Sequence, residues 1–335
     1  MTEPDTAHGA AAPDTAQRDL PGKPTDLGRG SWWAAGRRTV AEFKNDFLQD
    51  RAAALTYYSV QAIFPGILVL VSLLGLFGRS ATEPLITNLA SVVPSTARTI
   101  LLNAVHRLQH GHSAAGVLTI VGILLALWST SSYVAAFMRA ANAIYDVPEG
   151  RPAWKTLPLR LGVTVLLMVL LVASAAIVVL TGSLARHVGQ VLHIGTAAVT
   201  TWDIAKWPVL VILVCLMVAV LYWASPNARQ GLRWIIPGAM IAIGVWLAAS
   251  GLFALYVANF SHYNKVYGSI AGLIIFLIWL WLTNTAILFG AEFNAELERG
   301  RAIAAGTPPG TEPFVEMRDT RKLRRGGRRA KKSAA

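Results

Sequence analysis

The sequence is poor in charged residues, and long stretches have none. Only 14% of the 335 residues are Asp, Glu, Lys or Arg, against roughly 25% in an ordinary soluble domain. A helix needs about 20 apolar residues to cross the ~30 Å hydrocarbon core of a bilayer. The missing charge therefore excludes an ordinary soluble protein and predicts several membrane crossings. The uncharged stretches are residues 52–78, 113–138, 161–185, 207–228, 234–264 and 266–291.

Cysteine and the common catalytic motifs are also scarce. The one cysteine, Cys215, lies inside an apolar run, so a disulfide framework and a cysteine metal cluster are excluded. Nothing resembles a nucleophile elbow, a zincin helix or a phosphate loop. Metal-dependent RNA hydrolysis needs clustered carboxylates, whereas the acids of this chain fall mostly beside arginines at the span edges. We therefore expect no enzyme activity, no metal and no cofactor.

The apolar stretches predict the fold class. Backbone groups in lipid must bond within their own segment, so each stretch should be a helix. We predict an all-α polytopic membrane protein, a bundle of six transmembrane helices with amphipathic interfacial helices, within residues 52–301. The expected spans are residues 53–78, 114–137, 161–184, 207–225, 235–258 and 267–291.

The flanking segments have a different composition. Residues 1–30 lack the apolar core of a signal peptide and are expected to be disordered. Residues 31–51 place Val40, Phe43 and Phe47 at i, i+3 and i+7, which predicts an interfacial amphipathic helix. A helix that binds a cytoplasmic partner is the alternative. Two further short amphipathic helices are expected between the first two spans.

The basic residues gather on one side of the predicted spans. Of 30 Lys and Arg, 24 precede span 1, follow span 6 or fall in the even-numbered loops, and 6 fall on the other side. This asymmetry predicts an inner (plasma) membrane protein with both termini in the cytoplasm. Residues 302–335 are expected to form a disordered basic tail that contacts the bilayer through anionic lipid headgroups. Specific nucleic-acid binding is not expected because no aromatic residues are interleaved in the tail. Protein partners stay unidentified, and an oligomer stays open.

Polar residues within the spans are the candidate functional residues, because each is costly in hydrocarbon unless it is paired or faces water. Asn284 and Glu292 are eight residues apart and share one helical face. Together with Gln61 they could form a ligand or proton site. The alternative, which we favour, is interhelical hydrogen bonding plus an ion pair from Glu292 to Arg51 or Arg139.

Small residues and proline suggest two local features. Pro65 and Gly66 near the middle of span 1 predict a break in that helix. Gly268 and Gly272 form a GxxxG pattern, which predicts a close contact between helices.

Several motifs together resemble the YihY/BrkB family of membrane proteins over residues 34–301. They include residues 50–60 (DRAAALTYYSV), 226–229 (PNAR), 281–284 (WLTN) and 290–296 (GAEFNAE). The resemblance implies a bacterial inner-membrane protein with six helices and no established activity. A ribonuclease BN name once attached to the family is not supported by the residues. The family's polar positions join Gln61 in a candidate polar membrane site: Tyr57, Arg139, Asn259, Asn264, Tyr267, Asn284 and Glu292.

Three functions follow from these observations. A permease or exporter of ions, small solutes or lipid comes first, because span 1 is expected to be broken and span 6 is polar. A non-transporting envelope scaffold or assembly factor is the alternative, and a membrane-bound ribonuclease is third. Transport needs a water-accessible polar path between the spans, whereas a scaffold needs a sealed core.

Overall fold

The computed structural model describes residues 21–75, 114–179, 196–259 and 264–324, with some side chains at the helix ends left out. This part of the chain is helical and has no strand beyond an isolated bridge between Ala228 and Met317. The elements are η1 (Pro24–Asp26), α1 (Arg29–Asn45), α2 (Leu48–Gly75), α5 (Ala114–Ile144), α6 (Ala153–Val179), α8 (Thr196–Ala224), α9 (Leu232–Asn259) and α10 (Asn264–Ala304).

The long helices confirm an all-α polytopic membrane protein. Four segments are long and apolar enough to cross a membrane: Ala153–Val178, Ile204–Ala224, Leu232–Asn259 and Ala271–Ala304. Helices α2 and α5 coincide with the first two predicted spans. The predicted count of six spans is not exact, because four helices in the described part of the chain meet this requirement of length and composition. The last segment has 34 residues and rises about 51 Å, so its final turns extend beyond the hydrocarbon.

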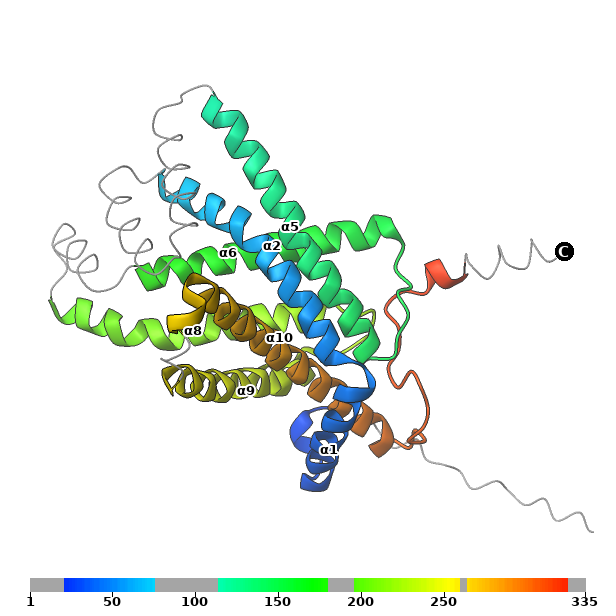
Figure 1. Ribbon diagram of the computed structural model, residues 1–335. Helices are drawn as coiled ribbons and strands as arrows, with labels where there is room; N and C mark the ends of the chain where they lie inside the picture. The colour runs from blue at the N-terminus through cyan, green and yellow to red at the C-terminus, as the bar shows by residue number, and fades with distance from the viewer. Residues whose placement is uncertain (1–20, 76–113, 180–195, 260–263, 325–335) are drawn as a thin grey trace, which may run out of the picture.

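Helix α10 lies at the centre of the bundle (Figure 1) and contacts α1, α2, α5 and α9. Helix α2 runs beside α5, and α1 lies against the last turns of α10. We call the end of the bundle where α1 lies the polar end; it comprises α1 and residues 145–152, 225–231 and 305–324.

The buried core lies in the half of the bundle nearest the polar end. Leu55, Phe137, Ile235 and Leu288 are each less than 2% exposed. Large apolar residues nearer the opposite helix ends, such as Leu252, are exposed. These exposed side chains are suited to contact with lipid.

Helix α1 differs from the predicted interfacial helix of residues 31–51. It ends at Asn45, Phe47 adopts a left-handed φ of 52°, and α2 begins at Leu48. The buried face of α1 consists of Ala35, Thr39 and Phe43, and the ring of Phe43 lies 5.8 Å from that of Phe289 on α10. Packing on α10 thus determines its orientation, and the expected face is only partly buried.

Two other expectations are also wrong. Helix α2 continues through Pro65 and Gly66 without interruption, since a membrane helix can accommodate proline when other groups bond the freed backbone. The expected disorder does not hold for residues 21–30 or 302–324. Phe314, Val315 and Met317 pack against the core, a contribution that the basic composition of the tail conceals. The short helices expected between spans 1 and 2 lie outside the described residues.

Candidate functional site

One face of α10 carries a row of buried polar side chains. Asn284, Glu292 and Glu296 are 2%, 1% and 2% exposed. The Arg299 side chain is 11% exposed. Spacings of eight, four and three residues keep these groups on one helical face. The row therefore runs from the middle of a membrane span to the polar end.

Asn284 links three helices inside the bundle. Its Oδ1 accepts a hydrogen bond from the Tyr133 hydroxyl of α5 at 3.0 Å. Its Nδ2 donates to Thr56 Oγ1 of α2 at 3.2 Å and to Leu280 O of its own helix at 3.0 Å. The amide is satisfied on both sides, as a buried polar group requires.

Glu292 is buried but lacks the predicted partner. Its Oε2 has no hydrogen-bond partner among the described residues, and none of their ion pairs includes it. Arg51 instead donates to the carbonyl of Asp46 at 2.9 Å, and Arg139 is exposed. The predicted ion pair to Arg51 or Arg139 is therefore wrong. An isolated buried carboxylate costs on the order of several kcal/mol, so this position is energetically unusual.

Acidic side chains outnumber basic ones around the last turns of α10. Arg299 contacts four carboxylates, those of Glu42 at 3.6 Å, Asp146 at 3.5 Å, Glu296 at 3.4 Å and Glu312 at 3.0 Å. Arg38 of α1 also pairs with Glu296. Glu292 and Asp46 lie close enough to these carboxylates for their charges to interact. We call the six carboxylates the acidic cluster: Glu42, Asp46, Asp146, Glu292, Glu296 and Glu312.

Burial and neighbouring carboxylates raise the pKa values of two cluster members, Asp46 and Asp146. Burial, reinforced by the negative charge of Asp146, raises the pKa of Asp46 from 3.8 to about 6. Burial and the charge of Glu312 also raise the pKa of Asp146. Asp46 can therefore exchange a proton closer to neutral pH than an ordinary aspartate.

The other predicted site residues whose side chains are described do not join Asn284 and Glu292. Tyr57, Gln61, Arg139 and Asn259 are exposed, and Asn259 Nδ2 donates to Leu255 O of its own helix at 2.8 Å. The side chains of Asn264 and Tyr267 and the surroundings of Gly268 lie outside the described residues. Of the six predicted site residues whose side chains the structure describes, only Asn284 and Glu292 lie together in the polar row of α10.

The predicted close contact at Gly272 is also absent from the described chain. A Cβ there would meet nothing within 4 Å. Close approach occurs instead between Gly238 of α9 and Gly290 of α10, where an added Cβ would overlap the opposite backbone.

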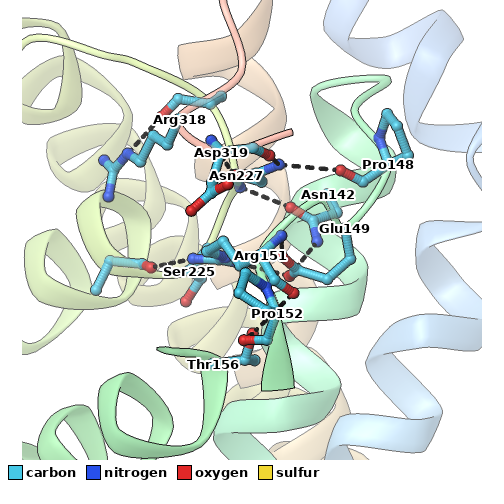
Figure 2. Close-up of polar contacts among 12 residues, drawn as sticks. Asn142, Pro148, Glu149, Arg151, Pro152, Thr156, Ser225, Asn227, Arg318 and Asp319 are labelled. Atoms are coloured by element: carbon cyan, nitrogen blue, oxygen red, sulfur yellow. Dashed lines mark hydrogen bonds and ion pairs between the residues drawn. The ribbon is translucent and has the colours of Figure 1, made fainter. Parts of the chain in front are cut away.

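A polar network that the sequence did not predict lies at the polar end, centred on Asn227 (Figure 2). The backbone N–H of Asn227 donates to Asn142 Oδ1 at 2.7 Å. Its Nδ2 donates to Pro148 O at 3.1 Å and Asp319 O at 2.9 Å, and its Oδ1 accepts from Asp319 N at 3.1 Å. Asn227 thereby joins both loops of the polar end to the C-terminal segment. The one sequence signal that pointed to Asn227 was its position in the motif of residues 226–229.

Arg151 extends this network. It pairs with Glu149 at 2.7 Å and donates to the carbonyls of Ser225 at 2.7 Å and Ala224 at 3.3 Å (Figure 2). Burial of Glu149 opposes ionisation, but hydrogen bonds and charge from Arg151 lower its pKa overall. The network fixes the loops relative to one another and offers no group suited to catalysis.

The fold and its polar row define a polytopic helical membrane protein with buried polar groups on a long central helix. The chain belongs to the virulence factor BrkB family, whose sequence model matches residues 39–313. No solved structure matches the chain.

Curated relatives agree with this membership. A "Putative ribonuclease-like protein YfkH" of Bacillus subtilis is 28% identical over 78% of this chain and 94% of its own length. A "UPF0761 membrane protein" of Alkalilimnicola ehrlichii is 32% identical over 80% of this chain, and another from Xanthomonas campestris is 26% identical over 84%. The chain spans 60% and 65% of the length of those two relatives.

Proposed function

We propose that this membrane protein is a permease or exporter of ions, small solutes or lipid in the bacterial inner membrane. The observation that carries the proposal is the polar row of α10, which includes a buried carboxyl, Glu292, whose Oε2 has no partner among the described residues. Intramembrane ionisable groups are costly, and they mark ion and substrate pathways in many membrane proteins. A purely structural Glu at this position would be expected to have a basic partner.

The acidic cluster gives this polar row a connection to the polar end. Asp46 and Asp146 lie outside the spans, have raised pKa values, and interact by charge with Glu292. A proton or cation at Glu292 would therefore have acceptor groups leading toward one side of the membrane. These groups support cation or proton coupling at the same site.

An envelope scaffold or assembly factor is the second candidate. The network around Asn227 and Arg151 favours it, because a fixed polar end is suited to holding a partner. A scaffold predicts no flux, whereas a permease predicts flux that depends on the polar row.

We also propose that both termini face the cytoplasm and that the protein is not a ribonuclease. The 24-to-6 distribution of basic residues supports the orientation. In the described part of the chain no three His, Cys, Asp or Glu come together in a way that could hold a metal ion. The name of YfkH contains the word ribonuclease, but we do not assign that activity to this chain. Contact with anionic headgroups through the basic tail remains part of the proposal.

Reconstitution tests the permease directly. The purified full chain is placed in liposomes, and flux of protons, K⁺, inorganic phosphate and a fluorescent phospholipid is compared with that in protein-free liposomes. Flux of at least one probe supports transport. Absence of flux for all four, with the protein shown to be folded, favours the scaffold.

A further inference from the structure

A basic pocket of about 810 Å³ lies at the polar end, between the start of α9 and the end of α10. Ten described residues line it, and four of them are arginines while none is acidic. The arginines come from three separate segments: Arg229 and Arg233 from the start of α9 and the loop before it, Arg301 from α10, and Arg318 from the C-terminal segment. Folding therefore brings four positive charges from separate segments of the chain together in this pocket.

Two of the arginines are held in place by tryptophan rings. The Arg301 guanidinium lies 4.9 Å from the ring centroid of Trp234, and that of Arg318 lies 5.2 Å from the ring of Trp223. Among the described residues, Arg318 donates only to carbonyl oxygens, Ala228 O at 2.7 Å and Trp223 O at 2.6 Å. Ring stacking orients a guanidinium at little entropic cost, so these two groups are pre-organised.

The positive charge is only partly compensated. Arg301 pairs with Glu298 at 3.2 Å. Arg229 pairs with Glu316 at 3.1 Å, but both side chains are well exposed, at 66% and 79%, and such pairs are weak. Arg233 is exposed and has no ion pair or hydrogen bond among the described residues. Among the described residues, the four arginines of the pocket thus have only two carboxylates, Glu298 and Glu316, as ion-pair partners.

An exposed apolar stripe leads from this pocket into the membrane. Leu232, which lines the pocket, is 66% exposed, and Ile236 and Met240 follow at 56% and 66%. Their spacing of four residues puts them on one face of α9, within the spanning segment Leu232–Asn259. The pocket therefore lies at the end of a spanning segment, with an exposed apolar surface directly beside it.

We propose that this pocket binds the phosphate of an anionic phospholipid, with an acyl chain lying along Leu232, Ile236 and Met240. Guanidinium groups bind phosphate oxygens through paired, charge-assisted hydrogen bonds. A free phosphate ion shares the headgroup chemistry but makes no use of the apolar stripe, and for this reason the lipid is the occupant assigned. The proposal does not depend on transport.

The test measures binding of a fluorescent phosphatidylglycerol to the full chain in phosphatidylcholine nanodiscs. The variant Arg229→Gln/Arg233→Gln removes two exposed pocket charges without disturbing the stacked arginines. The matched control, Arg37→Gln/Arg324→Gln, removes two exposed charges of the polar end outside the pocket. Thermal melting of each variant verifies folding.

We expect the pocket variant to weaken binding about tenfold relative to the control variant, and inorganic phosphate to compete poorly. Equal weakening in both variants would mean that general surface charge attracts the lipid, and this would overturn the proposal. Full competition by inorganic phosphate would assign the pocket to a soluble anion and would overturn the lipid assignment.

Discussion

Gly238 of α9 and Gly290 of α10 face each other so closely that a Cβ on either would overlap the carbonyl oxygen of the other. The Tyr222 hydroxyl and the Ala242 methyl close the remaining space around Gly290. Beside them, Asn294 Oδ1 accepts from Gly238 N at 2.7 Å, and its Nδ2 donates to Ile235 O at 3.0 Å. Close backbone approach and a satisfied amide together fasten α9 to α10, the helix that carries the polar row.

Gly290→Ala should therefore destabilise the protein by about 1–3 kcal/mol, as overpacking typically does. Gly272→Ala is the matched control, because a Cβ there meets nothing within 4 Å in the described chain. Thermal melting of the purified variants checks this. Equal melting temperatures for the two variants would mean that α9 and α10 are not in close contact.

The sequence predicted the helices well because missing charge over about 20 residues is a local signal. The contact between helices depends on which faces meet, and a GxxxG pattern does not identify the partner. Gly268 and Gly272 were selected for their spacing, whereas Gly290 belongs to no such pair. The same limit explains why Glu292 was assigned a basic partner that it lacks among the described residues.

Asn284→Leu should lower stability by about 1–2 kcal/mol, because the Tyr133 hydroxyl and the Thr56 hydroxyl both lose a partner inside the bundle. Asn259→Leu serves as the control, since its amide is exposed and bonds within its own helix. The free energy of unfolding in detergent, measured by denaturant titration, compares the two. A larger loss for the Asn259 variant would contradict the role given to Asn284.

The stability should depend on pH through Asp46. Its pKa is raised to about 6 from 3.8, so the folded state holds the proton more tightly. The resulting stabilisation is fully present below about pH 4 and is lost as the pH rises through about 6. Asp46→Asn should flatten the fall in melting temperature between pH 4 and 7, whereas Asp50→Asn, an exposed carboxylate at the start of α2, should not. An unchanged slope in Asp46→Asn would refute the raised pKa of Asp46 in the folded state.

The C-terminal segment shows why composition alone is a poor guide to order. Residues 311–324 are polar and basic, which predicted disorder. The apolar Phe314 and Met317, together with backbone bonds to Asn227 and Arg229, nevertheless dock the segment. Neither contact could be inferred without knowing that the 225–231 loop lies at the same end of the bundle.

Purified protein should not cleave tRNA, with or without divalent metal ions. In the part of the chain that the structure describes, no three His, Cys, Asp or Glu side chains are placed to hold a metal ion together, which metal-assisted phosphodiester cleavage needs. A gel assay on labelled tRNA after stringent purification checks this. Metal-dependent cleavage that disappears in Asp46→Asn or Asp146→Asn would contradict it.

Glu292 provides the most direct test of transport, because Gln has the same shape but binds no exchangeable acidic proton. Liposomes containing wild-type protein or Glu292→Gln are compared for flux of the probe that the wild type carries, with melting temperatures measured on the same preparations. Glu292→Gln should melt within about 4 °C of wild type and lose flux by a factor of about ten or more. Unchanged flux in Glu292→Gln would contradict a transport role for Glu292. So would a large loss of stability in the variant together with a folded wild type that carries no probe.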